Sequence, residues 1–280
     1  MQPKAFRILH EDAHLVFVDK PAKMLAVPVE GAEAKGPSLV ERLNAEGRGL
    51  IAVHRLDYET SGVIVLAKDQ ETADALIGIF RKKLIKKVYQ ALVHGWLQPP
   101  SGDYDFPIKD LGADARISPK GEAALTHYST VEKVGPCSLV RIEIETGRHN
   151  QVRLHFAHSG HPLIGERKYA RGAAFPIKHG RVLLHAREVA FQPPHLKHVL
   201  RIQAPLPADF LAAVEKARAL PCTSAPKKIA PLAIAEGPYA AKKPHSQTAK
   251  RSAPRADREE RAAPRRGIGR VDSRPRKGRR

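Results

Sequence analysis

Short runs of β-branched residues, separated by breaks that contain Gly, Pro and Asp, limit the fold of this chain more than any other feature. Five such runs predict strands, at 14–20, 62–68, 87–95, 138–146 and 198–206. Helical periodicity is rarer and predicts helices at 70–84, 150–160 and 208–218. Because strands outnumber helices and do not alternate with them regularly, we expect an α+β fold. Its sheet should be mixed and largely antiparallel, with flanking helices, rather than doubly wound and parallel.

The chain changes character near residue 220. Residues 1–220 have the alternating apolar runs of one packed domain, whereas 221–280 consist mainly of Ala, Pro, Lys and Arg, with Tyr239 as the single aromatic residue. Such a segment buries too little apolar surface to offset the entropy lost on ordering. We therefore predict one domain over 1–220 and a disordered basic tail over 221–280.

The charge balance points to a polyanionic partner. The chain has 48 Lys and Arg against 29 Asp and Glu, a net charge of +19, and both the predicted domain and the tail are positive. Composition alone does not separate RNA from DNA or from an anionic membrane. The two cysteines, Cys137 and Cys222, favour a reducing compartment and give neither a disulfide framework nor a zinc site.

Targeting and membrane signals are missing from the sequence. No apolar run approaches the roughly 20 residues that span a bilayer, and charges interrupt the apolar residues of the N-terminal segment, which therefore does not resemble a signal peptide. We expect a cytoplasmic protein that does not insert into a membrane, with a monomer as the default oligomeric state.

The stretch VHRLDYETSGVIVLAKD, residues 53–69, is the first candidate for chemistry. It places His54, Arg55 and Asp57 directly before a Thr-Ser-Gly turn and a buried strand. A carboxylate held at a strand entrance beside an arginine is a plausible catalytic arrangement. From composition alone a solvated surface loop is the commoner explanation of such a pattern.

The stretch IETGRHNQVRLHFAHSGHPLIGERKYA, residues 144–170, is the second candidate. A strand ends at Thr146-Gly147, and Arg, His, Asn and Gln residues then crowd the start of a helix. Backbone donors and guanidinium groups there suit an anion, while a capped amphipathic helix is the simpler alternative. His155, His158 and His161 lack a carboxylate or Cys partner at ligand spacing, so we predict no metal site.

Together these stretches resemble the RluA-type RNA pseudouridine synthases. Residues 53–69 are similar to the family's HRLD-x-x-TSG signature, and 144–170 to its TGR-x-HQ-x-R-x-H…GHP element. Residues 87–91, KVYQA, resemble its K-x-Y-x-A strand. The opening ILHEDAHLVFVDKPAKMLAVP and the closing LLHAREVAF and LRIQAPLPADF also resemble family segments. The likeness covers roughly residues 6–215, with its motifs in the family's order.

The resemblance implies isomerisation of uridine to pseudouridine in RNA, with no cofactor. The glycosidic C–N bond breaks, the uracil rotates, and a C–C bond forms through C5. Asp57 is implied as the catalytic carboxylate, which attacks the sugar, stabilises its positive charge or abstracts a proton; the sequence does not choose among these. Arg153 is implied as its ionic partner, with a phosphate contact as the alternative.

The remaining site residues also follow from the resemblance. Tyr89 is implied to pack on the target base and to assist proton transfer, although a tyrosine in an alternating strand is more often a core residue. Arg55 is implied to fill the space that a flipped uridine leaves, and Leu184 to form the apolar floor under the base. His54 is expected to support the loop, and Glu59 to be solvated.

Two residues depart from the family pattern. Lys23 stands where the K-P-x-G turn usually has Gly, which bears on the geometry of the turn. Asn150 follows His149 where the family usually has His, so the role of that histidine either falls to Asn150 or is lost.

The expected substrate is a stem-loop of ribosomal RNA or transfer RNA, because a loop uridine is cheaper to extrude than a paired one. We expect no nucleotide cofactor. Two other classes stay open from the sequence: a non-catalytic RNA-binding protein on the same scaffold, and a general nucleic-acid-binding protein whose basic tail is its main feature. If Asp57→Ala loses activity but keeps RNA binding, the protein is an enzyme and not the non-catalytic RNA-binding protein. A preference for duplex DNA over folded RNA would favour the general nucleic-acid-binding protein.

Overall fold

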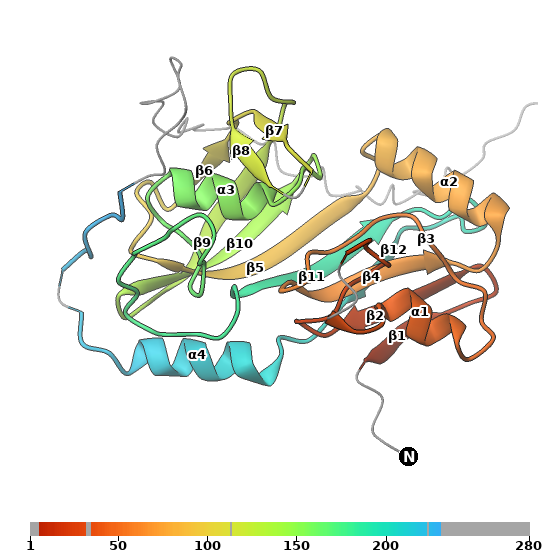
Figure 1. Ribbon diagram of the computed structural model, residues 1–280, viewed down its shortest axis with the longest axis horizontal. Coiled ribbons are helices and arrows are strands. Elements are labelled where there is room, and N and C mark those ends of the chain that lie inside the picture. The colour runs from red at the N-terminus through yellow and green to blue at the C-terminus, as the bar shows by residue number, and fades with distance from the viewer. Residues whose placement is uncertain (1–5, 32–34, 113, 223, 231–280) are drawn as a thin grey trace, which may run out of the picture. The chain divides into compact units, whose positions relative to one another are not determined.

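A ten-stranded, mostly antiparallel sheet forms the centre of the fold (Figure 1). The computed structural model describes residues 6–31, 35–112, 114–222 and 224–230. The strands there are β1 (Arg7–Glu11), β2 (Leu15–Lys20), β3 (Ile51–Ala52), β4 (Ser61–Ala67), β5 (Lys86–His94), β6 (Ser101–Tyr104), β7 (Ile108–Asp110), β8 (Ala115–Ile117), β9 (Thr126–Val134), β10 (Cys137–Ile144), β11 (Leu184–Phe191) and β12 (Leu200–Gln203). The helices are α1 (Leu39–Asn44), α2 (Gln70–Arg81), α3 (Gln151–His158) and α4 (Ala208–Arg218).

The sheet runs in the order β1-β2-β4-β11-β5-β10-β9-β6, with β3 beside β4 and β12 beside β11. Among the described pairings of this sheet, only β4 and β11 run parallel, through Ser61–His185 and Gly62–Ala186. Gly62 has φ +113°, and a Cβ at this position would lie 2.2 Å from the carbonyl oxygen of Ala186. Only glycine lets the two backbones approach this closely. The Thr-Ser-Gly turn therefore joins the segment that carries Asp57 to the middle of the sheet.

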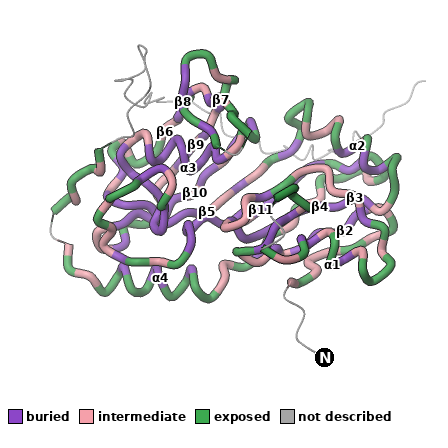
Figure 2. The backbone as a smooth tube through the Cα atoms, in the orientation of Figure 1, coloured by how far each residue is buried: buried purple, intermediate pink, exposed green. Residues whose placement is uncertain are grey.

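Helices cover both faces of the sheet. On one face α1 packs through Leu39 and Leu43 on β2 and β4, while α3 packs through Val152 and Phe156 on the β5–β10 half. The opposite face is covered by α2 and α4. Buried residues are concentrated along the central strands of the sheet, which these helices cover (Figure 2).

The α1 and α3 clusters lie on the same face of the sheet. Leu184 belongs to the α3 cluster and Ala186 to the α1 cluster, and residues two apart on a strand point the same way. Tyr89 packs against both clusters. Between α1 and α3, this face of the sheet therefore presents the middle strands β5 and β11, with Tyr89 and Leu184.

The expected α+β class is confirmed, and every strand and helix predicted from the sequence is present within two or three residues at most of its boundaries. The largest differences are at α2, which ends at Arg81 rather than at 84, and at β12, which is shorter than predicted. Asp69 begins α2 because its carboxylate accepts the backbone N–H of Thr72 at 2.8 Å.

Several elements were missed by sequence reasoning. Helix α1 is only six residues long, yet Ser38 and Glu41 form a complete capping box that marks its start. Strand β11 is buried on both faces, so it lacks the polar alternation that identifies a half-exposed strand. In these two segments, one short and one fully buried, periodicity carries little information. Strand β9 was also missed, although it is nine residues long and partly exposed.

Residues 224–230 belong to the segment assigned to the tail from the sequence, and they contact the domain. The backbone N–H of Ile229 donates to the carbonyl of Gly160 at 3.1 Å, and the ring Nε2 of His94 lies 2.9 Å from the carbonyl oxygen of Lys227. The described contacts thus extend to Ile229, nine residues beyond position 220. The rest of the predicted tail, from 231 on, lies outside the described residues. No helix in the described ranges combines the length and apolar character that a membrane span needs.

Candidate active site

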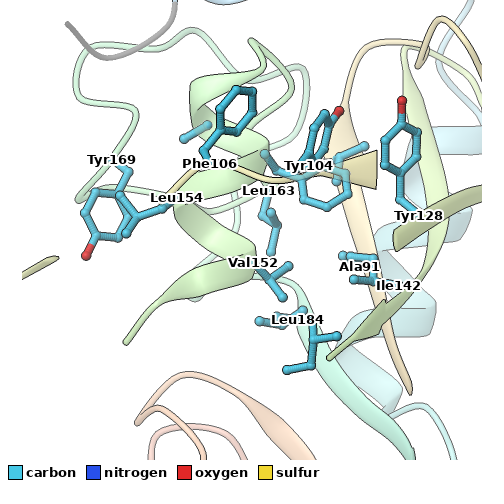
Figure 3. Close-up of a cluster of buried hydrophobic side chains, with 14 of the residues drawn as sticks. Ala91, Tyr104, Phe106, Tyr128, Ile142, Val152, Leu154, Leu163, Tyr169 and Leu184 are labelled. Carbon is cyan, nitrogen blue, oxygen red and sulfur yellow. The ribbon is translucent and has the colours of Figure 1, made fainter. Parts of the chain in front are cut away.

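One small cavity brings together all five residues that the sequence singled out. It has a volume of about 80 Å³ and lies on the face of the sheet between α1 and α3. Asp57 and Arg55 reach it from the segment before β4, Tyr89 from β5, Leu184 from β11 and Arg153 from α3. Val152 of α3 faces Leu184 across the apolar part of this region (Figure 3). Segments up to about 130 positions apart therefore meet at one site.

Local contacts hold the segment that carries Asp57. The carbonyl of Asp57 accepts the backbone N–H of Thr60 at 3.1 Å, which closes a turn directly before β4. The ring of His54 stacks on Phe80 at 4.7 Å, and its Nε2 accepts the backbone N–H of Val65 at 3.0 Å. Burial lowers the pKa of His54 to about 3. The neutral imidazole therefore supports the loop, as expected, and contributes no charge to the site.

Tyr89 lies under the cavity and keeps its proton. Burial raises the pKa of its phenol, and the negative charge of Asp57 raises the pKa further. That second contribution requires the two side chains to lie near each other. At neutral pH the Tyr89 hydroxyl is consequently a hydrogen-bond donor and not a phenolate.

Arg153 is buried in a different ion pair from the one expected. Its Nε and Nη2 donate to the two carboxylate oxygens of Glu166 at 2.7 and 2.9 Å. Glu166 is 1 % exposed. Within the described residues the direct partner of Arg153 is thus Glu166, and Asp57 acts on it only as a more distant charge. The described residues contain no salt bridge between Asp57 and Arg153, because the neighbouring Gly-Glu-Arg segment supplies a closer carboxylate. Arg153 remains a partner of Asp57 through its charge alone.

Asn150 holds the other side of the Arg153 guanidinium. Its amide oxygen accepts from Arg153 Nη1 at 3.1 Å, and its amide nitrogen donates to the hydroxyl of Tyr169 at 2.8 Å. Asn150 adopts φ +53°, a left-handed conformation that asparagine tolerates better than most residues. At this position asparagine thus fixes the arginine that faces the cavity.

Lys20 is a residue of the site that sequence reasoning missed. It ends β2, is fully buried, and donates through Nζ to the carbonyl oxygens of Met24 and Pro21 at 2.8 and 2.9 Å. Burial lowers its pKa to about 7, and the carboxylate of Asp57 is the main charge that opposes this shift. The sequence did contain a signal that could have identified Lys20, because this lysine directly follows an apolar strand and precedes Pro21.

Lys20 should make the stability of the fold depend on pH. Because the folded pKa lies below the ordinary value of 10.5, the unfolded chain binds more protons between pH 7 and 10. The free energy of unfolding should therefore rise with pH in this window, by about 2 kcal/mol from pH 7 to 9 through this group. Urea unfolding at several pH values would measure it. The variant Lys20→Met should show a smaller rise, because, of the described residues, only Lys87, whose pKa burial lowers to about 8, then contributes in the same way. An equal rise in both proteins would contradict the assignment.

The other residues near the cavity are placed as follows. Arg55 is exposed at the cavity and is available to a ligand. Glu59 is not simply solvated, because its carboxylate accepts from Arg167 at 2.6 Å. His155 and His161 each form a hydrogen bond with a backbone carbonyl oxygen, of Phe106 and His94 respectively.

A carboxylate beside a protonated tyrosine and a buried arginine, over an apolar floor in a basic protein, suits an enzyme that acts on one unit of a polyanion. Comparisons with known proteins identify the class. The RNA pseudouridylate synthase family matches residues 14–158. The chain belongs to this family, and it is of the RluA type. It is therefore an RNA-modifying isomerase.

Relatives extend the match over most of the chain. An uncharacterized RNA pseudouridine synthase of Mycobacterium bovis is 36 % identical over 222 residues, which cover 74 % of this chain and 71 % of that protein. Ribosomal large subunit pseudouridine synthase D of Nitrosomonas europaea is 33 % identical, covering 78 % and 67 %. The solved structure of human RNA pseudouridylate synthase domain containing 4 superposes with a TM-score of 0.62 at 26 % identity, covering 76 % of this chain and 94 % of that one.

Proposed function

We propose that the protein isomerises a uridine in a stem-loop of ribosomal RNA, with Asp57 as the catalytic carboxylate. The observation that carries the proposal is the cavity in which Asp57, Tyr89 and Arg153 converge over Leu184. The choice of ribosomal over transfer RNA is supported by relatives named for the large ribosomal subunit, from Nitrosomonas europaea and Vibrio vulnificus.

Each side chain around the cavity has a separate role in the proposed reaction. Leu184 and Val152 offer an apolar floor to the uracil, and the Tyr89 ring lies beside it. The carboxylate of Asp57 stabilises the positive charge that develops on the ribose as the glycosidic bond breaks. Arg153 and the buried Lys20 place positive charge near that carboxylate. Arg55, exposed at the cavity, occupies the space that the flipped uridine leaves in the RNA.

Tritium release from RNA labelled at uracil C5 tests the function. Release occurs only when C5 loses its hydrogen on forming the new C–C bond. Transcripts of large-subunit ribosomal RNA, small-subunit ribosomal RNA and pooled transfer RNA should be compared. We expect release from large-subunit RNA alone. Release from transfer RNA only would overturn the proposed substrate, and no release from any RNA despite tight binding would favour the non-catalytic RNA-binding alternative.

The basic residues beyond 230 are proposed to add phosphate contacts that do not depend on sequence. A chain that ends at residue 230 keeps the contacts of Lys227 and Ile229 with the domain. Its RNA affinity should fall less steeply with salt than that of the full chain. The slope should decrease by about 0.7–0.9 for each lost cation that contacts a phosphate. Fluorescence anisotropy between 50 and 300 mM salt would measure it, and equal slopes would show that the segment contributes no such contacts.

A further inference from the structure

A second cavity, larger than the catalytic one, lies where β2 ends and β4 begins. Its volume is about 650 Å³. It is bounded by the start of β1, the turn after β2, residues 179–181 and the start of α4. Its walls combine cations and carboxylates with apolar groups. None of Arg55, Asp57, Tyr89, Arg153 and Leu184 lines it, whereas Lys20, which lies in the field of Asp57, does.

The inner wall of this cavity is rigid. Arg181 is 2 % exposed and donates from Nε and Nη2 to the carboxylate of Asp209 at 2.6 and 3.0 Å. Its Nη1 donates to the carbonyl of Val182 at 3.1 Å. Lys20, held by two carbonyls, forms the neighbouring part of the wall. Arg181 is already paired with Asp209, and Lys20 already donates to two carbonyl oxygens. Both side chains therefore shape the cavity and leave ligand binding to other groups.

Two cations at the rim are free to bind a ligand. Arg7 and Lys23 are both exposed, and neither side chain has a hydrogen bond or a salt bridge within 4.0 Å in the described ranges. Asp19, which lines the same cavity, lies in the field of Arg7. Lys23 has φ +58°, in the turn where the family pattern usually has glycine. A left-handed lysine costs about 1 kcal/mol relative to glycine, and here it places an ammonium group at the rim. Arg7 and Lys23 therefore suit a phosphate.

Apolar groups complete the site. Phe6, Pro21 and Pro207 line the same cavity as the two rim cations. An aromatic ring beside basic side chains is the combination that binds single-stranded nucleic acid, because each base has a face to stack and each phosphate a charge to neutralise.

The two cavities are neighbours along one short segment. Thr60 lines the catalytic cavity and Ser61, the next residue, lines the larger one. Lys20 belongs to the larger cavity and lies in the field of Asp57. An RNA strand whose uridine occupies the catalytic cavity would have to pass around the turn at residues 57–61, at the start of β4, to reach the second cavity.

We propose that the larger cavity binds a second, unstacked nucleotide of the substrate RNA strand. Its base packs on Phe6 and the prolines, and its phosphate binds Arg7 and Lys23. Extruding a uridine breaks stacking with its neighbours, and capture of a second nucleotide offsets part of that cost. The inference rests on the proposed function, since it requires RNA in the catalytic cavity.

Binding of a fluorescein-labelled ten-residue oligouridylate to the full chain tests the proposal. The double variant Arg7→Gln/Lys23→Asn removes both rim charges, and asparagine tolerates the left-handed backbone. We expect about a tenfold loss of affinity at 0.1 M salt, with a salt slope lower by about 1.4. Phe6→Ala should weaken binding at least about fivefold with no change in slope.

Lys197→Gln/Lys216→Gln is the matched control, because it removes the same charge from exposed positions outside both cavities. An Arg7/Lys23 variant that binds like this control, or a Phe6→Ala variant that binds like wild type, would overturn the second nucleotide site. This readout is independent of turnover. Absent tritium release by the wild-type protein would instead count against the proposed function.

Discussion

Asp57→Asn will lower tritium release from the substrate RNA by about a thousandfold or more while RNA affinity stays within a fewfold of wild type. The substitution keeps the shape of the side chain and removes its charge. The carboxylate is then absent when positive charge develops on the ribose, and preorganised electrostatic groups of this kind contribute factors of this size. Single-turnover release with saturating protein separates the chemical step from binding.

Glu59→Gln is the matched control for Asp57→Asn. It removes a carboxylate two residues away, whose partner is the exposed Arg167. This variant should keep its rate within about threefold, because an exposed pair contributes little. Turnover by Asp57→Asn at a rate similar to that of the control would refute the catalytic role of Asp57.

Glu166→Ala will destabilise the fold by about 3–5 kcal/mol. The buried guanidinium of Arg153 would lose both of its strongest hydrogen bonds and keep its charge. Urea unfolding at pH 7 gives the free energy of unfolding. The same variant should also slow tritium release, because Asn150 alone would then position Arg153 at the cavity.

The double variant Arg153→Met/Glu166→Leu distinguishes an unpaired charge from a general packing defect. Replacing both partners with apolar residues of similar size removes the buried charge altogether, so the double variant should be more stable than Glu166→Ala. Its tritium release should nevertheless stay low, because no cation remains at that side of the cavity. A double variant less stable than Glu166→Ala would show that the pair itself contributes most of the stability.

Local patterns in the sequence were sufficient for the fold class and for the types of residue at the site. The β-branched runs predicted β2, β4, β5, β10 and β12 because strand formation follows a short-range alternation. The resemblance to known motifs selected Asp57, Tyr89, Arg153, Arg55 and Leu184, and these side chains all line one cavity.

Charge pairing, in contrast, could not be derived from the sequence. Lys20 and Asp57 are 37 positions apart, and Arg167 and Glu59 are 108 apart. Lys20 lies near Asp57 only because β2 and β4 are neighbours in the sheet. Arg167 reaches Glu59 only because the segment after α3 folds back onto the turn at residues 57–61. The choice of Glu166 over Asp57 as partner of Arg153 has the same origin, since ionic partners are set by distance and burial in three dimensions.

The sequence by itself determined that this chain folds into an α+β domain with the residues of an RNA pseudouridine synthase. Those properties depend on periodicity and on motifs that are contiguous in the chain. The tertiary structure alone decided which buried charges neutralise one another, and that a second basic and aromatic cavity lies beside the catalytic one. The physical reason is that desolvation and Coulomb energy depend on which distant segments meet, and in this fold the parallel contact of β4 with β11 at Gly62 brings them together.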